Sequence, residues 1–284
     1  MNALPLAKKA AVLKALTEGA SIRAAARMVG VSKTTVLKLL VEVGEFCAGY
    51  QNYVLRGLPC RRVQADEIWA FVGAKAKNAR TPGFGDIWTF VAIDAETKLV
   101  VSWLVGSRNA EHAEVFMRDV ASRLAHRVQL TTDGHSMYLS AVEDAFGWNG
   151  VDFAQLQKVY GSEPEGERRY SPPVCLGAIK RWVTGQPDEA HVSTSYVERA
   201  NLTIRMHSRR FTRLTNGFSK KSENHMYAVA LHFFVSNFCR PHTTLTRARG
   251  GIHTSPAMAA GLTDHVWTVE KMLGMMNPTT VISS

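Results

Sequence analysis

The sequence predicts an α/β protein in which a mixed β-sheet flanked by helices follows a small all-α domain. Three runs rich in Val, Ile, Trp and Phe are separated by turn-forming residues, which indicates antiparallel strands at residues 63–73, 86–94 and 99–106. Apolar periodicity then predicts a helix, a short strand and a second helix at residues 109–125, 128–132 and 136–146. The order of three strands, helix, strand and helix gives a mixed sheet.

Three short helices are predicted in the N-terminal domain, at residues 6–16, 22–29 and 33–40. Gly19 and Gly30 suit helix ends, and Ser21 and Ser32 suit the N-caps of the helices that follow. This spacing is typical of a helix-turn-helix, whose third helix faces the bases and phosphates of a major groove. Its outward residues are Lys33, Thr34, Thr35 and Lys38. An ordinary helical bundle without a ligand is the alternative interpretation.

The charge balance favours a polyanionic partner. The 284 residues include 34 Lys and Arg against 24 Asp and Glu, a formal net charge of +10. Nucleic acid is the leading candidate, and a basic surface that serves only solubility is the alternative.

The four cysteines form no Cys-x-x-Cys pair, so neither a zinc knuckle nor a disulfide framework is expected. No long apolar segment predicts export or membrane insertion, and we expect a cytoplasmic protein with no membrane partner.

Three acidic residues lie in settings that suggest a divalent-metal site. Asp66 lies within the first predicted strand, Asp133 ends the fourth, and Glu198 lies on a helix predicted over residues 194–210. A carboxylate in an apolar strand is costly to bury unless it is paired, hydrogen-bonded or bound to a cation. If the first and fourth strands are neighbours, Asp66 and Asp133 lie close enough to hold a pair of Mg²⁺ ions about 3.5–4 Å apart. Glu67 faces the opposite side of its strand and is a second choice.

The helix that carries Glu198 also places Asn201 and Arg205 on the same face, at i+3 and i+7, and we expect this face to approach both the metals and the DNA, with Asn201 and Arg205 as DNA-binding candidates. A solvated helix with a charged stripe is the alternative to a catalytic helix.

The basic run that follows this helix contains interleaved aromatic residues and is suited to binding a phosphate backbone. Its cations are Arg205, Arg209, Arg210, Arg213, Lys220 and Lys221. His135 is a weak candidate for contact with a phosphate or a metal-bound water. Trp182 is expected in the core, with insertion into unpaired DNA as the alternative.

Five segments together resemble a known family. They are residues 66–69 (DEIW), 132–134 (TDG), 196–205 (YVERANLTIR), 209–221 (RRFTRLTNGFSKK) and 237–245 (NFCRPHTTL). The first three resemble the acidic-motif blocks of DDE transposases, specifically of the insertion sequence 1 family, and the last two are similar to its C-terminal region. The likeness covers most of the chain. The order of strands and helices also resembles the ribonuclease H-like fold, in which the first and fourth strands lie side by side.

The resemblance implies a DNA transposase that cleaves the ends of a mobile element and transfers the strands, in a nucleoid-associated setting in a bacterium. Asp66, Asp133 and Glu198 would be catalytic ligands of two Mg²⁺ (or Mn²⁺) ions per active site. The partners would be double-stranded DNA, at element ends and target, and further copies in a homodimer or higher assembly. Some family members begin with a cysteine-bearing zinc finger, for which this chain has no cysteines.

The expected domain plan places the helix-turn-helix at residues 1–48, a linker at 49–61, the catalytic domain at 62–250 and a C-terminal tail at 251–284. The 64 residues between Asp133 and Glu198 predict an insertion at about residues 150–190. Two other functions remain open: a catalytically inactive, domesticated DNA-binding regulator, and a structure-specific nuclease of the same fold.

Overall fold

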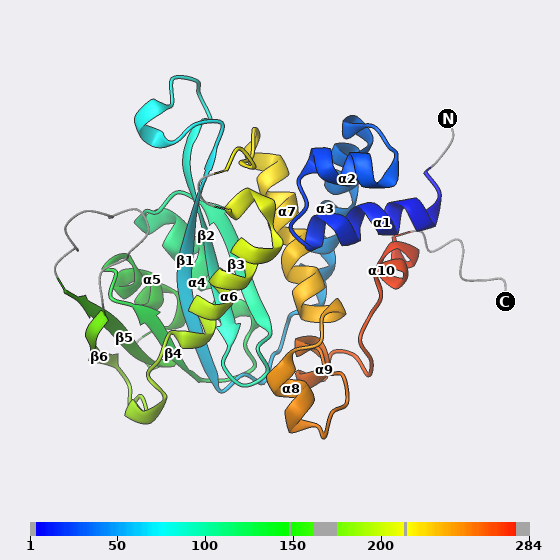
Figure 1. The fold of residues 1–284 in the computed structure, drawn as a ribbon. Coiled ribbons are helices and arrows are strands. Elements are labelled where there is room, and N and C mark those ends of the chain that lie inside the picture. Colours follow the sequence, from blue (N-terminus) through cyan, green and yellow to red (C-terminus); the bar gives the residue numbers. More distant parts are fainter. Residues whose placement is uncertain (1–3, 148, 162–174, 213–214, 277–284) are drawn as a thin grey trace.

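A six-stranded sheet forms the centre of the computed structural model, which describes residues 4–147, 149–161, 175–212 and 215–276 (Figure 1). Its strands are β1 (Arg62–Val72), β2 (Gly85–Asp94), β3 (Val100–Gly106), β4 (Val128–Asp133), β5 (Val151–Tyr160) and β6 (Cys175–Thr184). The α-helices are α1 (Leu6–Thr17), α2 (Ile22–Val29), α3 (Lys33–Val54), α4 (Ala110–Arg123), α5 (Met137–Phe146), α6 (Ser195–His207), α7 (Ser222–Phe234), α8 (Thr243–Ala248), α9 (Pro256–Ala259) and α10 (Val269–Met275). Short 3₁₀ turns are η1 (Ala76–Asn78), η2 (Glu189–His191) and η3 (Arg209–Phe211), and a π-helical turn, η4 (Val235–Cys239), continues α7. Among the described helices, none combines the length and apolarity needed to cross a membrane.

The strand order is β3-β2-β1-β4-β5-β6. β1 pairs antiparallel with β2 and parallel with β4, β2 pairs antiparallel with β3, and β4 pairs parallel with β5. The mixed α/β sheet flanked by helices is therefore confirmed, with the first and fourth strands side by side as in the ribonuclease H-like fold. The parallel register pairs Ala65 with Thr132, so Asp66 and Asp133 follow at equivalent positions.

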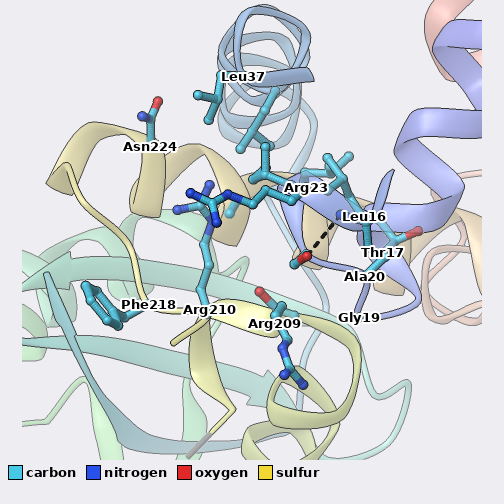
Figure 2. A pocket seen from close by; sticks show the side chains of 18 of the residues that line it. Leu16, Thr17, Gly19, Ala20, Arg23, Leu37, Arg209, Arg210, Phe218 and Asn224 are labelled. Carbon is cyan, nitrogen blue, oxygen red and sulfur yellow. Dashed lines mark hydrogen bonds between the residues drawn. The ribbon is translucent and has the colours of Figure 1, made fainter. Parts of the chain in front are cut away.

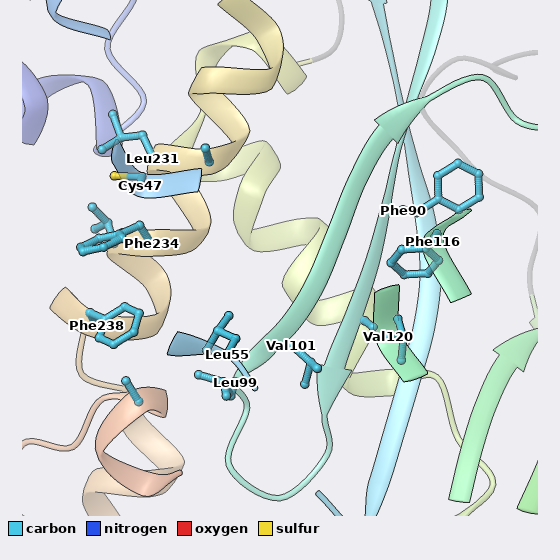
Figure 3. Packing of buried hydrophobic residues seen from close by; sticks show 14 of the residues in the cluster. Cys47, Leu55, Phe90, Leu99, Val101, Phe116, Val120, Leu231, Phe234 and Phe238 are labelled. Atoms are coloured by element: carbon cyan, nitrogen blue, oxygen red, sulfur yellow. The ribbon is translucent and has the colours of Figure 1, made fainter. Parts of the chain in front are cut away.

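The two faces of the sheet carry separate cores. On one face Phe90 of β2 packs against Phe116 of α4, with ring centroids 5.5 Å apart (Figure 3). On the other face Ile68 of β1 packs with Val197 and Ile204 of α6. Because side chains alternate along a strand, Asp66 faces α6 whereas Glu67 faces α4 and α5. This alternation decides which helix can supply partners to each carboxylate.

The first two N-terminal helices begin and end close to the predicted residues. Gly30 adopts a left-handed conformation (φ 67°) after α2, and the Ser21 and Ser32 hydroxyls accept hydrogen bonds from the backbone N–H groups of Ala24 and Thr35. The third helix differs from the prediction, because α3 continues through Val54 and includes half of the expected linker.

Close packing against α7 explains the length of α3. At Gly44 the two helices approach so closely that an added Cβ would lie 2.4 Å from the Cβ of Tyr227. Val43 and Cys47 are fully buried on the same side of α3. The core cluster continues from this contact to the sheet, so α3 belongs to the same packed unit as the strands (Figure 3).

The structure corrects the expected burial of Trp182 and shows how two segments of the expected domain plan pack. The expected insertion contributes β5 and β6 to the sheet, and Trp182 on the edge strand β6 is 60% exposed instead of buried in the core. The described part of the expected tail is also packed: Trp267 lies in the core, 4.9 Å from Phe238 and 5.5 Å from Tyr50 between ring centroids. Aromatic burial therefore fixes the C-terminal residues against α3 and α7.

Candidate active site

Three carboxylates meet where β4 ends. Each of Asp66, Glu67 and Asp133 places an oxygen within 4.8 Å of the others, and no other such group of His, Cys, Asp or Glu occurs among the described residues. The parallel pairing of β1 with β4 brings Asp66 and Asp133 to the same level. The structure thus brings together two of the three predicted metal ligands and adds Glu67, the second choice.

Asp66 is held by α6. Asn201 donates a hydrogen bond through Nδ2 to Asp66 Oδ2 at 3.0 Å. The pKa of Asp66 is raised to about 7, mainly by burial and also by the charges of Glu67 and Asp133, against opposing hydrogen bonds from the Glu67 backbone and Asn201. The carboxylate is therefore only partly ionised near neutral pH unless a cation offsets the surrounding negative charge.

Glu67 has its own supporting groups on the opposite face. Its side chain is 1% exposed, forms an ion pair with the Arg108 guanidinium, and accepts a hydrogen bond from Tyr138 Oη at 2.8 Å. Burial raises the pKa of Glu67, as does Asp133, whereas Tyr138 and Arg108 lower it. Arg108 Nη2 also lies 3.8 Å from Asp133 Oδ2, and its guanidinium lies over the Trp88 ring at 4.7 Å.

Sequence reasoning missed Arg108 and Tyr138. Neither belongs to a motif, because each contacts Glu67 across more than 40 positions of sequence: 41 for Arg108 and 71 for Tyr138. Arg108 lies between β3 and α4, and Tyr138 lies on α5, so only the folded arrangement brings them to the carboxylate on β1.

Glu198 lies outside the carboxylate group. Its Oε2 is 2.5 Å from Lys158 Nζ on β5, and its Oε1 accepts a hydrogen bond from Thr194 Oγ1 at 2.6 Å. The pKa of Lys158 is raised, since the hydrogen bond and charge of Glu198 outweigh the lowering effect of burial. Residues three apart on a helix are neighbours, so Glu198 is one turn from the Asn201 that contacts Asp66.

The donor set near Asp66 suits a hard divalent cation. Asn201 is 8% exposed, and its Oδ1 is buried without a hydrogen-bond partner among the described residues. A buried carbonyl oxygen without a partner costs about 1–3 kcal/mol. Carboxylate and amide oxygens are the ligands that Mg²⁺ and Mn²⁺ prefer, so the residues present fit such an ion.

His135 supports the end of β4 through its backbone and the start of α5 through its ring. Its backbone N–H donates to Asp133 Oδ1 at 3.1 Å, and its Nδ1 accepts from the Met137 N–H at 3.3 Å. Its carbonyl accepts a hydrogen bond from Gln155 Nε2 at 3.0 Å. These contacts orient Asp133.

The predicted DNA-binding residues occupy different environments. Lys33, Thr34 and Lys38 are exposed on α3, whereas Thr35 shares a hydrogen bond of 2.8 Å with the capping hydroxyl of Ser32. In the basic run, Arg205 and Arg210 are half-buried and three others are exposed: Arg209, Lys220 and Lys221. Arg213 lies outside the described residues. Asn201 contacts Asp66 inside the site.

No protein-family model matches this chain, and no curated protein matches it. Among solved structures, a pre-cleavage Mos1 transpososome is similar over 82% of this chain and 77% of that chain, at 14% sequence identity and a TM-score of 0.29. A Mos1 strand transfer complex is similar over the same shares at 14% identity and a TM-score of 0.25.

Proposed function

We propose that this protein is a metal-dependent DNA transposase that binds the ends of a mobile element, cleaves a DNA strand and transfers it to a target. One observation carries the proposal: the group of Asp66, Glu67 and Asp133, joined at Asp66 by an Asn201 whose Oδ1 lacks a partner. A buried cluster of like charges needs cations to remain ionised. The insertion sequence 1 family remains the finer proposal, supported by the five segments that resemble it.

Asp66, Asp133 and Asn201 would hold Mg²⁺ or Mn²⁺, two ions per active site, with Glu198 recruited once it leaves Lys158. When bound, divalent ions supply stabilisation for the negative charge that develops on phosphoryl oxygens during strand cleavage. The protein's own part is to hold these oxygens in place. Asn201 orients Asp66, the His135 backbone orients Asp133, and Tyr138 keeps Glu67 fixed on the far face.

Arg108 has a second task beside the metal ligands. Its guanidinium is ion-paired with Glu67 and approaches Asp133, so it lowers the cost of ionising both carboxylates. Because Glu67 already has an ion pair and a Tyr138 hydrogen bond, we assign it to electrostatic support and not to primary metal binding. The order of preference among the carboxylates is thus Asp66 and Asp133, then Glu198, then Glu67.

Double-stranded DNA is the proposed partner, at element ends and at the target. The net charge of +10 and the exposed cations on α3 and after α6 support binding to phosphates. Bringing two element ends together calls for a homodimer or higher assembly, which we propose without a defined interface.

The experiment measures Mn²⁺-dependent cleavage of an element-end duplex by Asp66→Asn, Asp133→Asn and Glu198→Gln. We expect each of the first two to reduce the cleavage rate by at least about 100-fold, while duplex binding in EDTA and the circular dichroism spectrum stay as in the wild type. Asp86→Asn is the matched control, because Asp86 is an exposed strand aspartate that only accepts a hydrogen bond from the Ala76 backbone. Wild-type cleavage by both Asp66→Asn and Asp133→Asn would rule out this active site.

A second assay supplies a supercoiled target together with pre-cleaved ends. A joined product is expected of a transposase. Cleavage of branched DNA without any joined product would indicate the structure-specific nuclease instead.

A further inference from the structure

A cavity of about 920 Å³ lies between the N-terminal helices and the segment that follows α6. One wall comes from α2 and the start of α3, including Arg23, Lys33 and Leu37. The other comes from η3, α7 and the residues between them (Figure 2). The cavity therefore joins the two parts of the chain proposed to contact DNA, and it is separate from the carboxylate group.

The lining is strongly basic. Six cations contribute to it, namely Arg23, Lys33, Arg209, Arg210, Lys220 and Lys221, and none of the described lining residues is acidic. None of the six forms an ion pair with a carboxylate in the part of the chain that the structure describes. Like charges gathered in a partly enclosed space repel one another strongly unless an anion lies among them.

Arg210 is fixed by neutral groups alone. Its Nη1 donates to Ser219 Oγ at 2.8 Å, and Ser219 Oγ is 2.9 Å from Nδ1 of the fully buried His225. Burial lowers the pKa of His225 to about 3, so that ring is neutral and adds no charge near pH 7. Burial lowers the pKa of Arg210 to about 10, which leaves the guanidinium charged. The Ser219–His225 pair thus holds a positive charge in place without neutralising it.

Two guanidinium groups converge in the cavity. Arg23 extends from α2 and Arg210 from η3, and their side chains point toward one another (Figure 2). Guanidinium forks match the oxygens of a phosphate, and two of them on opposite sides can bind one phosphate together. Apolar side chains lie beside them, among them Leu16, Leu37 and Phe218, which suits the sugar or a base of the same nucleotide.

We infer that this cavity binds a backbone phosphate of a DNA strand between Arg23 and Arg210. The inference rests on the proposed function for the identity of the polyanion, and it adds a specific site to it. Binding there would tie the N-terminal helices to the catalytic part of the chain through one strand.

The test measures the salt dependence of binding to a short fluorescein-labelled duplex by anisotropy in EDTA, where no cleavage occurs. The slope of log K against log salt is negative, and each lost phosphate contact lowers its magnitude by about 0.9. Arg23→Ala is compared with its matched control Arg27→Ala, which removes the same charge from an exposed site on α2 outside the cavity. Arg210→Lys keeps the charge at the second site and removes only the guanidinium group. Arg23 is exposed on its helix, so its variant is expected to fold even if a change at the half-buried Arg210 does not.

We expect Arg23→Ala to lower the magnitude of the slope by about 0.9 and to weaken binding roughly tenfold, with Arg27→Ala close to wild type. The double variant of Arg23 and Arg210 should weaken binding less than the two single effects combined, because both act on one phosphate. Equal slopes for Arg23→Ala and Arg27→Ala would overturn the inference, whether both match the wild type or both fall. Because binding is measured without metal, loss of cleavage in the Asp66 variant leaves this result unaffected.

Discussion

Replacing Gly44 with alanine tests whether α3 is packed against the catalytic part of the chain along its whole length. In the structure a Cβ at this position would lie 2.4 Å from Tyr227 Cβ and 2.8 Å from the Tyr227 backbone. Real side chains avoid contacts this short, so α3 and α7 would have to separate. If residues 49–61 were a linker and the third helix ended near residue 40, the same substitution would meet open space.

The expected cost follows from two opposing contributions. Separating well-packed elements to admit one extra methyl group typically costs about 1–3 kcal/mol. Alanine in a helix gains about 0.8–1 kcal/mol over glycine, which offsets part of that cost. Gly49 lies on the same helix with nothing within 4 Å of the added Cβ, so Gly49→Ala keeps only the gain.

Thermal and urea unfolding of both variants gives the comparison. We expect Gly44→Ala to lower the free energy of unfolding by up to about 2 kcal/mol and Gly49→Ala to raise it by about 0.8–1 kcal/mol. At this chain length, each kcal/mol corresponds to roughly 2 °C in Tm. A Gly44→Ala variant as stable as Gly49→Ala would refute the close crossing of α3 and α7.

Three further predictions concern the site and its surroundings. Lys158→Met removes the competitor for Glu198 and should tighten Mn²⁺ binding several-fold by calorimetry, whereas unchanged affinity would show that Glu198 is not a ligand. Tyr138→Phe leaves the buried Glu67 without one donor and should cost about 1–3 kcal/mol in urea unfolding, with no loss expected if Glu67 is solvated. The pKa of His225 falls from 6.5 to about 3 on folding, so its stabilising effect is complete above pH 6.5 and declines as pH falls. Relative to His225→Gln, the wild type should lose about 2 kcal/mol of stability between pH 7 and pH 5, and parallel profiles would contradict the burial of a neutral ring.

Local sequence signals were sufficient for the elements that local chemistry controls. The hydroxyls of Ser21 and Ser32 and the left-handed Gly30 determine where α2 ends and α3 begins. The alternating apolar runs predict β1, β2 and β3 to within one residue at either end. The mixed sheet follows, because strands joined by short turns pair antiparallel and a helical crossover returns the next strand in parallel.

Long-range packing decided the elements that were missed. Residues 41–54 contain two glycines and several β-branched residues, which weaken a helix in isolation, yet burial against α7 keeps them helical. The spacing between Asp133 and Glu198 predicts an insertion over the residues that form β5, and the pairing of β5 with β4 shows that they extend the sheet. Trp182 is exposed because β6 is an edge strand.

The strand register and the contact with Lys158 explain why Glu198 lies apart from Asp66 and Asp133. Asp66 and Asp133 approach because the register of two hydrogen-bonded strands fixes their Cα atoms. β5 continues this register, since Asp133 pairs with Leu156, and alternation then places Lys158 on the face that bears Asp133. The Lys158 ammonium therefore extends toward α6, where Glu198 binds it.

The charges around the end of β4 do not balance. Four carboxylates, Asp66, Glu67, Asp133 and Glu198, have two ion-pairing cations among the described residues, Arg108 and Lys158. If all four are ionised, two negative charges remain without a partner. Burial is the main cause of the rise in the pKa of Asp66 to about 7, and the charges of Glu67 and Asp133 add to it. A divalent cation would supply the missing charge and restore full ionisation of Asp66. The deficit is therefore the physical reason to expect a metal ion at the end of β4.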